Sequence, residues 1–317
     1  YFMKTYKISR IIANKISSIF QKNKISFKDS NELFTGKLAV KKFDADLSSN
    51  SFTIVSLTHY EMCLIHQYLR LQSKKSGDYR KNVYLPEDYR VNAIIGTLTK
   101  KTLNHIGQQY IKDLENLTML NFENFSEEER MFITSYEGSL PFSKLPSNFV
   151  NNTNLLSYLQ GKRVLVISNY PELIKIQHLN QKKLHPKINK NSSFEVLTIN
   201  PDLLFHEKEA FTLFEKLDAL KVEILKYYFD VALINLSVLN LPVASFISTL
   251  HRNSLALGNE IYQIFGIAKD SAEKSKHDDH WVDLSSYRSG NEDTFLATGI
   301  IGSPIKTKRT RRHKHVH

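Results

Sequence analysis

Short polar side chains follow four apolar runs in the second half of the chain, at the points where buried strands would end. They are Ser168, Asn169 and Tyr170 after the first run, Asn200 and Asp202 after the second, Asn235, Ser237 and Asn240 after the third, and Gly258, Asn259 and Glu260 after the fourth. Ligands of open parallel sheets bind outside the carboxyl ends of the strands. The set therefore predicts the hydrogen-bonding rim of a pocket, although each Asn or Ser alone is also suited to capping the next helix.

A second candidate site lies in the first half, where Thr58-His59-Tyr60-Glu61 joins a β-branched run to a helical pattern. A carboxylate at this turn is suited to binding a divalent metal or to acting as a base, and His59 is placed to assist it. The alternative is purely structural. Thr58 and Glu61 have the spacing of a capping box, in which the two side chains bond each other's backbone N–H groups.

Other motifs are weak or missing. The cluster His277-Asp278-Asp279-His280 has metal-ligand residue types, but its polar surroundings favour a solvated loop. The sequence contains no G-x-G-x-x-G, no G-x-x-x-x-G-K-[ST] and no G-x-S-x-G, which argues against standard dinucleotide-binding, P-loop and α/β-hydrolase sites. The single cysteine, Cys63, excludes an internal disulfide framework and fits a reducing compartment.

The elements that would position the polar residues alternate in type from Gly161 to Gly266. We expect strands at 163–168, 194–199, 230–234 and just before Gly258, and helices at 171–179, 207–228 and 242–251. This alternation predicts an α/β fold with a Rossmann-like parallel sheet and flanking helices.

The first half is expected to be more helical. It has one clear strand at 52–57, a helix at 60–71 and a mostly helical stretch over 92–133, and the Pro-, Gly- and Ser-rich segment 136–147 is interpreted as a linker. We divide the chain into a basic amphipathic helix (1–24), an N-terminal α/β half that carries the Glu61 turn (25–140), a Rossmann-like half (141–270) and a polar, basic C-terminal tail (271–317).

The net charge of +11 is concentrated at the two ends of the chain. Because the body is closer to neutral, no nucleic acid is expected as a partner. The basic helix over 1–24 suits an anionic membrane surface, with ordinary packing against the protein's own core as the alternative. No apolar stretch reaches the roughly 18 residues of a membrane span and no secretory signal is visible, so we expect a cytoplasmic protein, peripheral to the inner face of the membrane.

The second half also resembles a known family. The segments Gly161-Lys-Arg-Val-Leu-Val-Ile-Ser, Phe229-Asp-Val-Ala-Leu-Ile, Leu241-Pro-Val-Ala and Gly258-Asn-Glu-Ile-Tyr-Gln-Ile-Phe-Gly-Ile follow the order and spacing of GT-D-fold-like glycosyltransferase proteins of bacterial surface polysaccharide clusters. The resemblance covers about residues 50–270, and the strand–turn–helix around Glu61 is similar to the part of that family that carries an Asp-x-Glu motif.

The resemblance implies a GT-D-like glycosyltransferase that moves a sugar from a nucleotide-sugar donor to a glycan or lipid-linked acceptor, as in capsule or lipopolysaccharide synthesis. It gives Glu61 the role of helping to hold Mn²⁺ or Mg²⁺, and Glu61 with the neighbouring His59 is the candidate catalytic pair. Combined with the strand-end residues described above, it makes the donor-site candidates Ser168, Asn169, Asn235, Ser237, Asn240, Gly258, Asn259 and Gln263. Lys162 and Arg252 are candidates for neutralising the diphosphate.

The sequence departs from the family pattern at both sites. Only the Glu of Asp-x-Glu is present, and the glycine-rich turn of the family is replaced by Asn235-Leu-Ser-Val-Leu-Asn240. One carboxylate binds a hard cation weakly. The alternative function is therefore a catalytically degenerate relative that acts as an interaction protein in a glycan-assembly complex.

Overall fold

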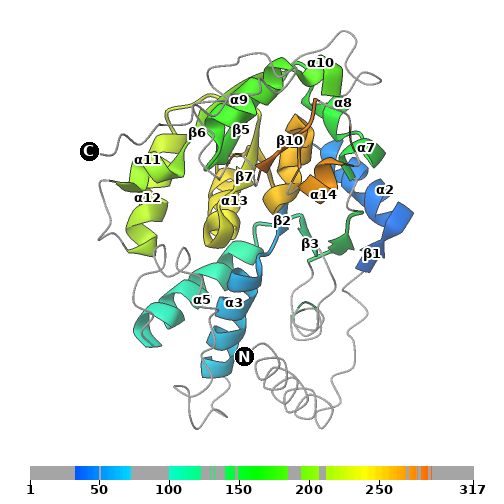
Figure 1. Cartoon of the computed structure of the whole chain (residues 1–317). Helices are drawn as coiled ribbons and strands as arrows, with labels where there is room; N and C mark the ends of the chain where they lie inside the picture. Colours follow the sequence, from blue (N-terminus) through cyan, green and yellow to red (C-terminus); the bar gives the residue numbers. More distant parts are fainter. Residues whose placement is uncertain are drawn as a thin grey trace, which may run out of the picture.

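The computed structural model describes most of the interior of the chain (Figure 1). The described residues are 33–49, 51–72, 100–122, 140–146, 149–184, 194–206, 212–268, 271–275 and 280–284, with 129, 132, 277 and 287. The predicted helix over 1–24 and the basic residues after 287 lie outside them. Among the described helices, none has both the length and the apolar character that a membrane crossing requires.

One eight-stranded sheet, parallel at every pairing, organises the molecule. Its strand order is β1-β4-β3-β2-β8-β7-β5-β6. The strands are β1 (Leu33–Thr35), β2 (Thr53–Ser56), β3 (Met119–Asn121), β4 (Phe142–Lys144), β5 (Arg163–Ser168), β6 (Glu195–Ile199), β7 (Val231–Asn235) and β8 (Asn253–Ala256). The two predicted halves thus share one sheet, and β4 of the second half lies between β1 and β3 of the first. We call the pairing of β2 with β8, in which Ile54 lies opposite Leu255, the seam of the sheet.

Helices cover both faces of the sheet, which is why its central strands are apolar on both sides. One face carries α3 (His59–Gln72), α5 (Lys100–Leu114), α12 (Leu213–Ile224) and α13 (Asn240–Thr249). The other carries α2 (Gly36–Leu47), α7 (Phe149–Asn152), α8 (Leu155–Leu159), α9 (Pro171–Leu179) and the 3₁₀ segment η3 (Gly258–Phe265). In β5, Leu165 and Ile167 face the first layer, and Val164 and Val166 face the second.

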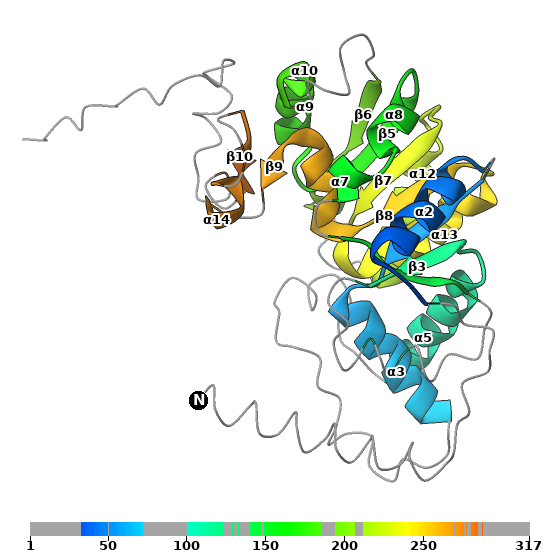
Figure 2. The same ribbon diagram turned by 90° about the vertical axis from the view of Figure 1, so that its right-hand side faces the viewer.

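The helices that pack on the seam come from both halves of the chain. Helices α3 and α5 lie side by side beneath the sheet, as the blue and cyan ribbons of Figure 2 show, and α5 also packs against α13. Gly107 of α5 permits this approach, because a Cβ atom there would lie 2.1 Å from Cβ of Tyr68 on α3. The first helical layer therefore ties the N-terminal half to the C-terminal half.

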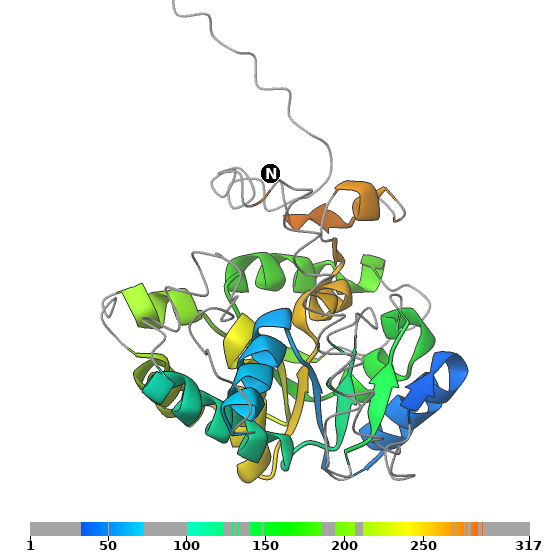
Figure 3. The same cartoon turned by 90° about the horizontal axis from the view of Figure 1, so that it is seen from below.

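Four short helices and two short strands complete the described chain. They are α10 (Gln181–Leu184), α11 (Pro201–His206), η2 (Ser237–Leu239) and α14 (Ser271–Lys274), and the two-residue strands β9 (Ile267–Ala268) and β10 (Val282–Asp283) pair in parallel. Figure 3 shows α14 and this pair, in orange, projecting from the body of the sheet. Part of the segment expected to be a polar tail is therefore folded.

The strands predicted for the second half are confirmed, whereas the helix predicted over 207–228 corresponds to α12, which begins at Leu213 with Thr212 as its N-cap and ends at Ile224. The strand predictions for the first half are incomplete. Strands β2, β5, β6, β7 and β8 lie where the sequence predicts them. Strands β1, β3 and β4 were not predicted: β3 lies within the stretch 92–133 that was expected to be mostly helical, and β4 lies within the segment interpreted as a linker. Each has three residues, which is too short for a period-two pattern to be recognised.

Candidate functional site

The predicted donor residues gather at the carboxyl ends of β5 and β7. These strands are neighbours, with Ser168 opposite Asn235, but the chain leaves them in opposite directions, from β5 to the edge strand β6 and from β7 to β8. Such a divergence is the topological switch point at which ligands of open α/β sheets bind. The structure therefore brings the ends of both strands together where a ligand site is expected.

Ser168 is the last residue of β5, at this switch point, and its side chain is fully buried. Its Oγ is 2.8 Å from the hydroxyl of Tyr262 in η3 and accepts a hydrogen bond from the backbone N–H of Tyr170 at 3.1 Å. The rings of Tyr170 and Tyr262 meet edge to face. Ser168 is thus a structural anchor for η3, while its neighbour Asn169 is exposed above it.

The 3₁₀ segment η3, which follows β8, packs against β7 beside the switch point. The amide of Asn235, at the end of β7, donates to Oδ1 of Asn259 at 3.0 Å, and Asn259 is exposed. Gly258 begins η3 with φ of +60°, a left-handed conformation that glycine adopts without strain. Gln263 of η3 is half-buried. These residues supply one exposed amide (Asn259), two half-buried amides (Asn235 and Gln263) and a glycine with a left-handed backbone at the end of β7 and in η3.

Ser237 and Asn240 belong to the turn that leads from β7 into α13. Ser237 has φ of +55°, which is unusual for a residue with a side chain and often marks a functional turn. Asn240 is fully buried, and its Oδ1 accepts from the backbone N–H of Leu236 at 2.7 Å. Its Nδ2 has no hydrogen-bond partner within the described part of the chain. Asn240 therefore stabilises the turn from inside, and only Ser237 faces outward in part.

Glu61 supports the same turn from the other half of the chain. Its Oε1 accepts the backbone N–H of Leu241, in the first turn of α13, at 2.8 Å. Its Oε2 accepts the backbone N–H and the hydroxyl of Thr58 at 2.8 and 3.0 Å, and the Glu61 N–H reaches Thr58 Oγ1 at 3.3 Å. The capping box predicted for Thr58 and Glu61 is present, and its glutamate also joins α3 to α13.

The environment of Glu61 is buried and acidic. Desolvation is the main cause that raises the pKa of Glu61 to about 7, opposed by its hydrogen bonds and reinforced by Asp113 of α5. Burial also raises the pKa of Asp113, and it raises that of Tyr110 well above its usual value. The Tyr110 hydroxyl donates to the carbonyl of Val238, in the same turn that Asn240 stabilises. Glu61 of α3 and Tyr110 of α5 thus both bond the β7–α13 turn.

This geometry assigns Glu61 a positioning role. The residue is 0% exposed and both carboxylate oxygens already accept hydrogen bonds, so a substrate does not reach it in this conformation. The site also does not fit a metal, because both oxygens of Glu61 already accept hydrogen bonds from N–H and O–H donors, and no group of three His, Cys, Asp or Glu side chains occurs within the described ranges. The backbone of His59 begins α3, and its side chain lies outside the described residues.

Lys162 and Arg252 do not reach the switch point. They precede β5 and β8 and therefore lie at the amino ends of the strands, whereas a diphosphate would bind at the carboxyl ends. The six residues of β5 separate the two ends by roughly 17 Å. Lys162 instead lies 4.4 Å from the ring of Tyr158, and Arg252 lies 4.8 Å from that of Tyr228. The expectation that these cations neutralise a diphosphate is wrong.

The structure describes His277 and His280 of the polar cluster His277–His280. His277 stacks on Trp281, with ring centroids 3.6 Å apart and planes 5° apart. Asp278 and Asp279 lie outside the described residues.

Sequence reasoning missed the residues that complete the site from a distance. The hydroxyl of Tyr262 is hydrogen-bonded to Ser168, and Tyr110 and Asp113 lie close to the carboxylate of Glu61. The signal in the sequence was a tyrosine on an apolar face, where a buried hydroxyl needs a partner. That signal shows that a partner exists but does not identify it.

Searches of known protein families, of curated proteins and of solved structures each give no match to this chain.

Proposed function

We propose that the protein is a glycosyltransferase that transfers a sugar from a nucleotide-sugar donor to a glycan acceptor in bacterial surface polysaccharide biosynthesis. The observation that carries the proposal is the switch point of the parallel sheet, where Ser168, Asn235, Ser237 and Asn259 come together from three turns. The resemblance of residues 50–270 to GT-D-like proteins adds the reaction class. The site of action is the cytoplasmic face of the membrane.

In this proposal the amides and the β7–α13 turn bind the donor. Asn235, Asn259 and Gln263 supply donors and acceptors at the rim, and Ser237 supplies a hydroxyl. Helix α9 begins just after β5, so the positive end of its dipole points toward the bound diphosphate, whereas the first turn of α13 already donates the N–H of Leu241 to Glu61. Glu61 fixes the turn and remains out of contact with the substrate. No step is assigned to a metal, because the residues around Glu61 do not fit one.

The direct test is calorimetric titration of the full chain with UDP, GDP and ADP and with their sugar conjugates, with and without Mn²⁺. We expect one of the nucleotide families to bind, and the Asn259→Ala variant to bind about tenfold more weakly, as for the loss of one good hydrogen bond. Asn154→Ala is the control, because Asn154 is also exposed but starts α8. If no nucleotide binds under either condition, the proposal is overturned.

A second candidate function is a non-catalytic scaffold of a glycan-assembly complex. The specific observation in its favour is that Ser168 bonds Tyr262 and Asn235 bonds Asn259, so these polar groups already satisfy one another. Glycan production can be compared between cells that lack the protein and cells that carry it with both Asn235→Ala and Asn259→Ala. Normal production by the double variant, with none in the deletion strain, would select the scaffold.

A further inference from the structure

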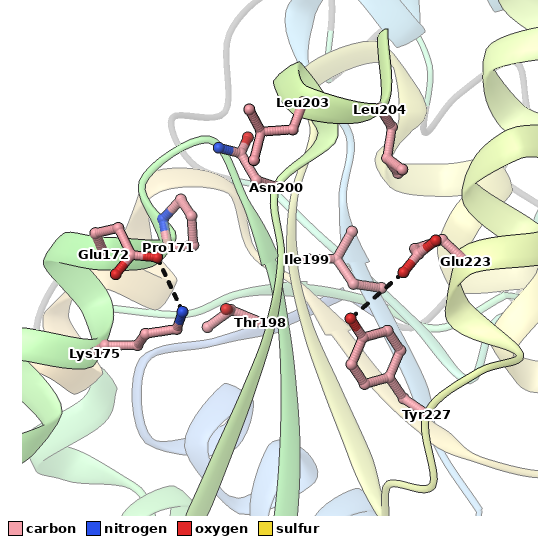
Figure 4. A pocket seen from close by; sticks show the side chains of 10 residues that line it. All are labelled: Pro171, Glu172, Lys175, Thr198, Ile199, Asn200, Leu203, Leu204, Glu223 and Tyr227. Atoms are coloured by element: carbon pink, nitrogen blue, oxygen red, sulfur yellow. Dashed lines mark hydrogen bonds and ion pairs between the residues drawn. The ribbon is translucent and has the colours of Figure 1, made fainter.

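A hollow of about 320 Å³ opens beside the edge strand β6 (Figure 4). Helix α9 lies on one face of the strand and α12 lies on the other, so the hollow spans the border of the sheet and not one of its faces. Its lining residues are Pro171, Glu172, Lys175, Thr198, Ile199, Asn200, Leu203, Leu204, Glu223 and Tyr227. We call β6 with these residues the β6 edge. A hollow along the border of a sheet has the position that a further strand would occupy.

The outer side of β6 presents backbone hydrogen-bonding groups. Among the described strands, β6 pairs only with β5. The N–H of Glu195 donates to the carbonyl of Lys162, which directly precedes β5, at 2.9 Å. Because the backbone groups of successive residues in a strand point to opposite sides, those of Leu197 also face β5, and those of Val196 and Thr198 face away from it. The outer side therefore offers two N–H groups and two carbonyls to a further strand.

The side chains of β6 do not protect the strand from such pairing. Edge strands usually avoid pairing by being very short or by carrying lysine, proline or a bulge. The other edge strand, β1, has three residues, whereas β6 has five and contains neither lysine nor proline. Its central residues, Val196, Leu197 and Thr198, are uncharged and half-buried. The strand is therefore suited to pairing with another strand.

The charges around the β6 edge are balanced. Three carboxylates lie there, and each has a cationic partner within 3.2 Å: Glu172 with Lys175, Glu195 with Arg163, and Glu223 with Lys226. In a two-fold contact the same patch meets itself, so an excess of one sign would repel its own copy. Because every acid here is paired with a base, the β6 edge suits a second copy of the chain better than a strongly charged partner.

A two-fold axis at Leu197 satisfies the outward backbone groups of both copies. In an antiparallel pairing about this axis, Val196 lies opposite Thr198 of the second copy, and Thr198 lies opposite its Val196. Directly opposed residues whose backbone groups face each other exchange two hydrogen bonds, so the two pairs form four. On the α12 face, Leu197 meets its own copy, and Leu203, which is 73% exposed in the single chain, supplies further apolar surface at the end of β6.

We propose that the protein forms a two-fold dimer in which β6 pairs antiparallel with β6 of a second copy, so that one continuous sheet crosses both chains. The backbone bonds of Val196 and Thr198 hold the two strands together, and Leu197 and Leu203 bury apolar surface beside them. None of the residues assigned to the donor site lines the β6 edge. The dimer therefore does not depend on the proposed function.

Light scattering of the full chain after size exclusion, over a range of protein concentrations, tests the dimer. We expect twice the 36.7 kDa of one chain. Thr198→Pro removes an outward N–H but no bond to β5, a place where edge strands tolerate proline, and should raise the Kd of the dimer at least about 100-fold. Leu203→Arg should raise it about tenfold. Leu179→Arg is the matched control, because Leu179 is 85% exposed on α9 but does not line the hollow.

Oxidative cross-linking tests the register. Residues at the non-hydrogen-bonded position on the axis have Cα atoms about 4.5 Å apart, within the range that a disulfide spans. Leu197→Cys should therefore form a cross-linked dimer. Thr198→Cys, which faces Val196 of the second copy and not its own, should cross-link far less. Wild type, which carries Cys63 on α3, gives the background.

Three results would overturn the dimer. The first is a monomer at every concentration, including one whose Val196 and Thr198 amides resist hydrogen exchange because another segment of the same chain covers them. The second is a dimer that Leu203→Arg leaves intact, and the third is equal weakening by Leu179→Arg. Circular dichroism checks that each variant is folded, and Leu203→Arg decides if Thr198→Pro is not.

Discussion

Two capping boxes in this chain have the same hydrogen bonds but different surroundings. At the start of α3, Glu61 accepts the Thr58 N–H at 2.8 Å, and at the start of α12, Glu215 accepts the Thr212 N–H at 2.7 Å. Glu61 is fully buried and its pKa is raised to about 7, mainly by desolvation. The pKa of Glu215 is lowered, because the hydrogen bonds from Thr212 favour the charged form and little desolvation opposes them. The motif sets the local geometry, and burial sets the charge.

The additional bond at Glu61 gives the buried box a second purpose. The third hydrogen-bond donor to Glu61 is the N–H of Leu241, which lies 180 residues away in the first turn of α13. The box of Thr212 and Glu215, by contrast, is confined to α12. A cap that also joins two helices should matter far more to stability than one that stays on the surface. The four predictions below test this difference, from the largest effect to the smallest.

Removing the buried glutamate should have the largest effect. Glu61→Ala is expected to lower the free energy of unfolding by about 4 kcal/mol, because the buried N–H of Leu241 and the partly buried N–H and hydroxyl of Thr58 lose their acceptor and a cavity forms. Urea denaturation at pH 6 measures the change. Glu215→Ala is the matched control and should cost much less. Equal losses for the two variants would show that the bond to Leu241 contributes nothing.

The buried box should also make stability depend on pH. Since the pKa of Glu61 is about 7 in the folded chain and 4.5 in the unfolded chain, its contribution is fully present below pH 4.5 and is lost as the pH rises through 7. The loss is about 3 kcal/mol for this shift. Glu61→Gln, which does not titrate, should flatten that part of the curve of unfolding free energy against pH.

The surface box provides the opposite control for the pH series. The lowered pKa of Glu215 makes its contribution present above the unfolded pKa and lost as the pH falls through the folded value. Glu215→Gln should therefore leave the region from pH 4.5 to 7 nearly as steep as in the wild type. A wild-type curve that is already flat there would contradict the burial argument.

The threonines of the two boxes should differ by less. Thr58→Ala is expected to cost about 2 kcal/mol and Thr212→Ala about 1 kcal/mol, the upper and middle parts of the range for N-cap residues. The difference arises because Thr58 also donates its hydroxyl to the buried carboxylate at 3.0 Å. Thermal denaturation of both variants measures it, and a larger loss for Thr212 would reverse the ranking.

The smallest effect should come from the turn that Glu61 supports. Ser237 has φ of +55°, a left-handed conformation that glycine adopts without the steric cost of a side chain. Ser237→Gly should therefore stabilise the chain by about 1 kcal/mol. His251→Gly is the control, because His251 has the same φ in an exposed turn outside this network. A destabilising Ser237→Gly would mean that the serine side chain contributes more than the strain it causes.

The fold was predictable where local patterns are long enough to be read. The five-residue β7 and the six-residue β5 are continuous apolar runs, and Pro171 marks the first turn of α9. Strands β1, β3 and β4 are determined by pairing with neighbouring strands and not by a sequence pattern. Leu120, for example, lies between its partners in β2 and β4, and a three-residue segment carries no hydrophobic alternation that would predict this pairing. The Thr212–Glu215 box was readable as T-x-x-E but lies inside a region interpreted as continuous helix.

The candidate site divides in the same way. The residues that end β5, β7 and β8 were predictable, because parallel strands must bring their carboxyl ends to one edge, and the capping box of Glu61 was predictable from its spacing. The same rule puts Lys162 and Arg252 at the opposite edge, because both precede predicted strands, but only the tertiary structure enclosed Glu61 among Leu241, Tyr110 and Asp113. Spacing fixes hydrogen bonds within a turn, but desolvation depends on which distant elements cover that turn. For this reason the sequence alone determined the cap, and the packing of α5 and α13 decided that its carboxylate is a support and not an exposed acid.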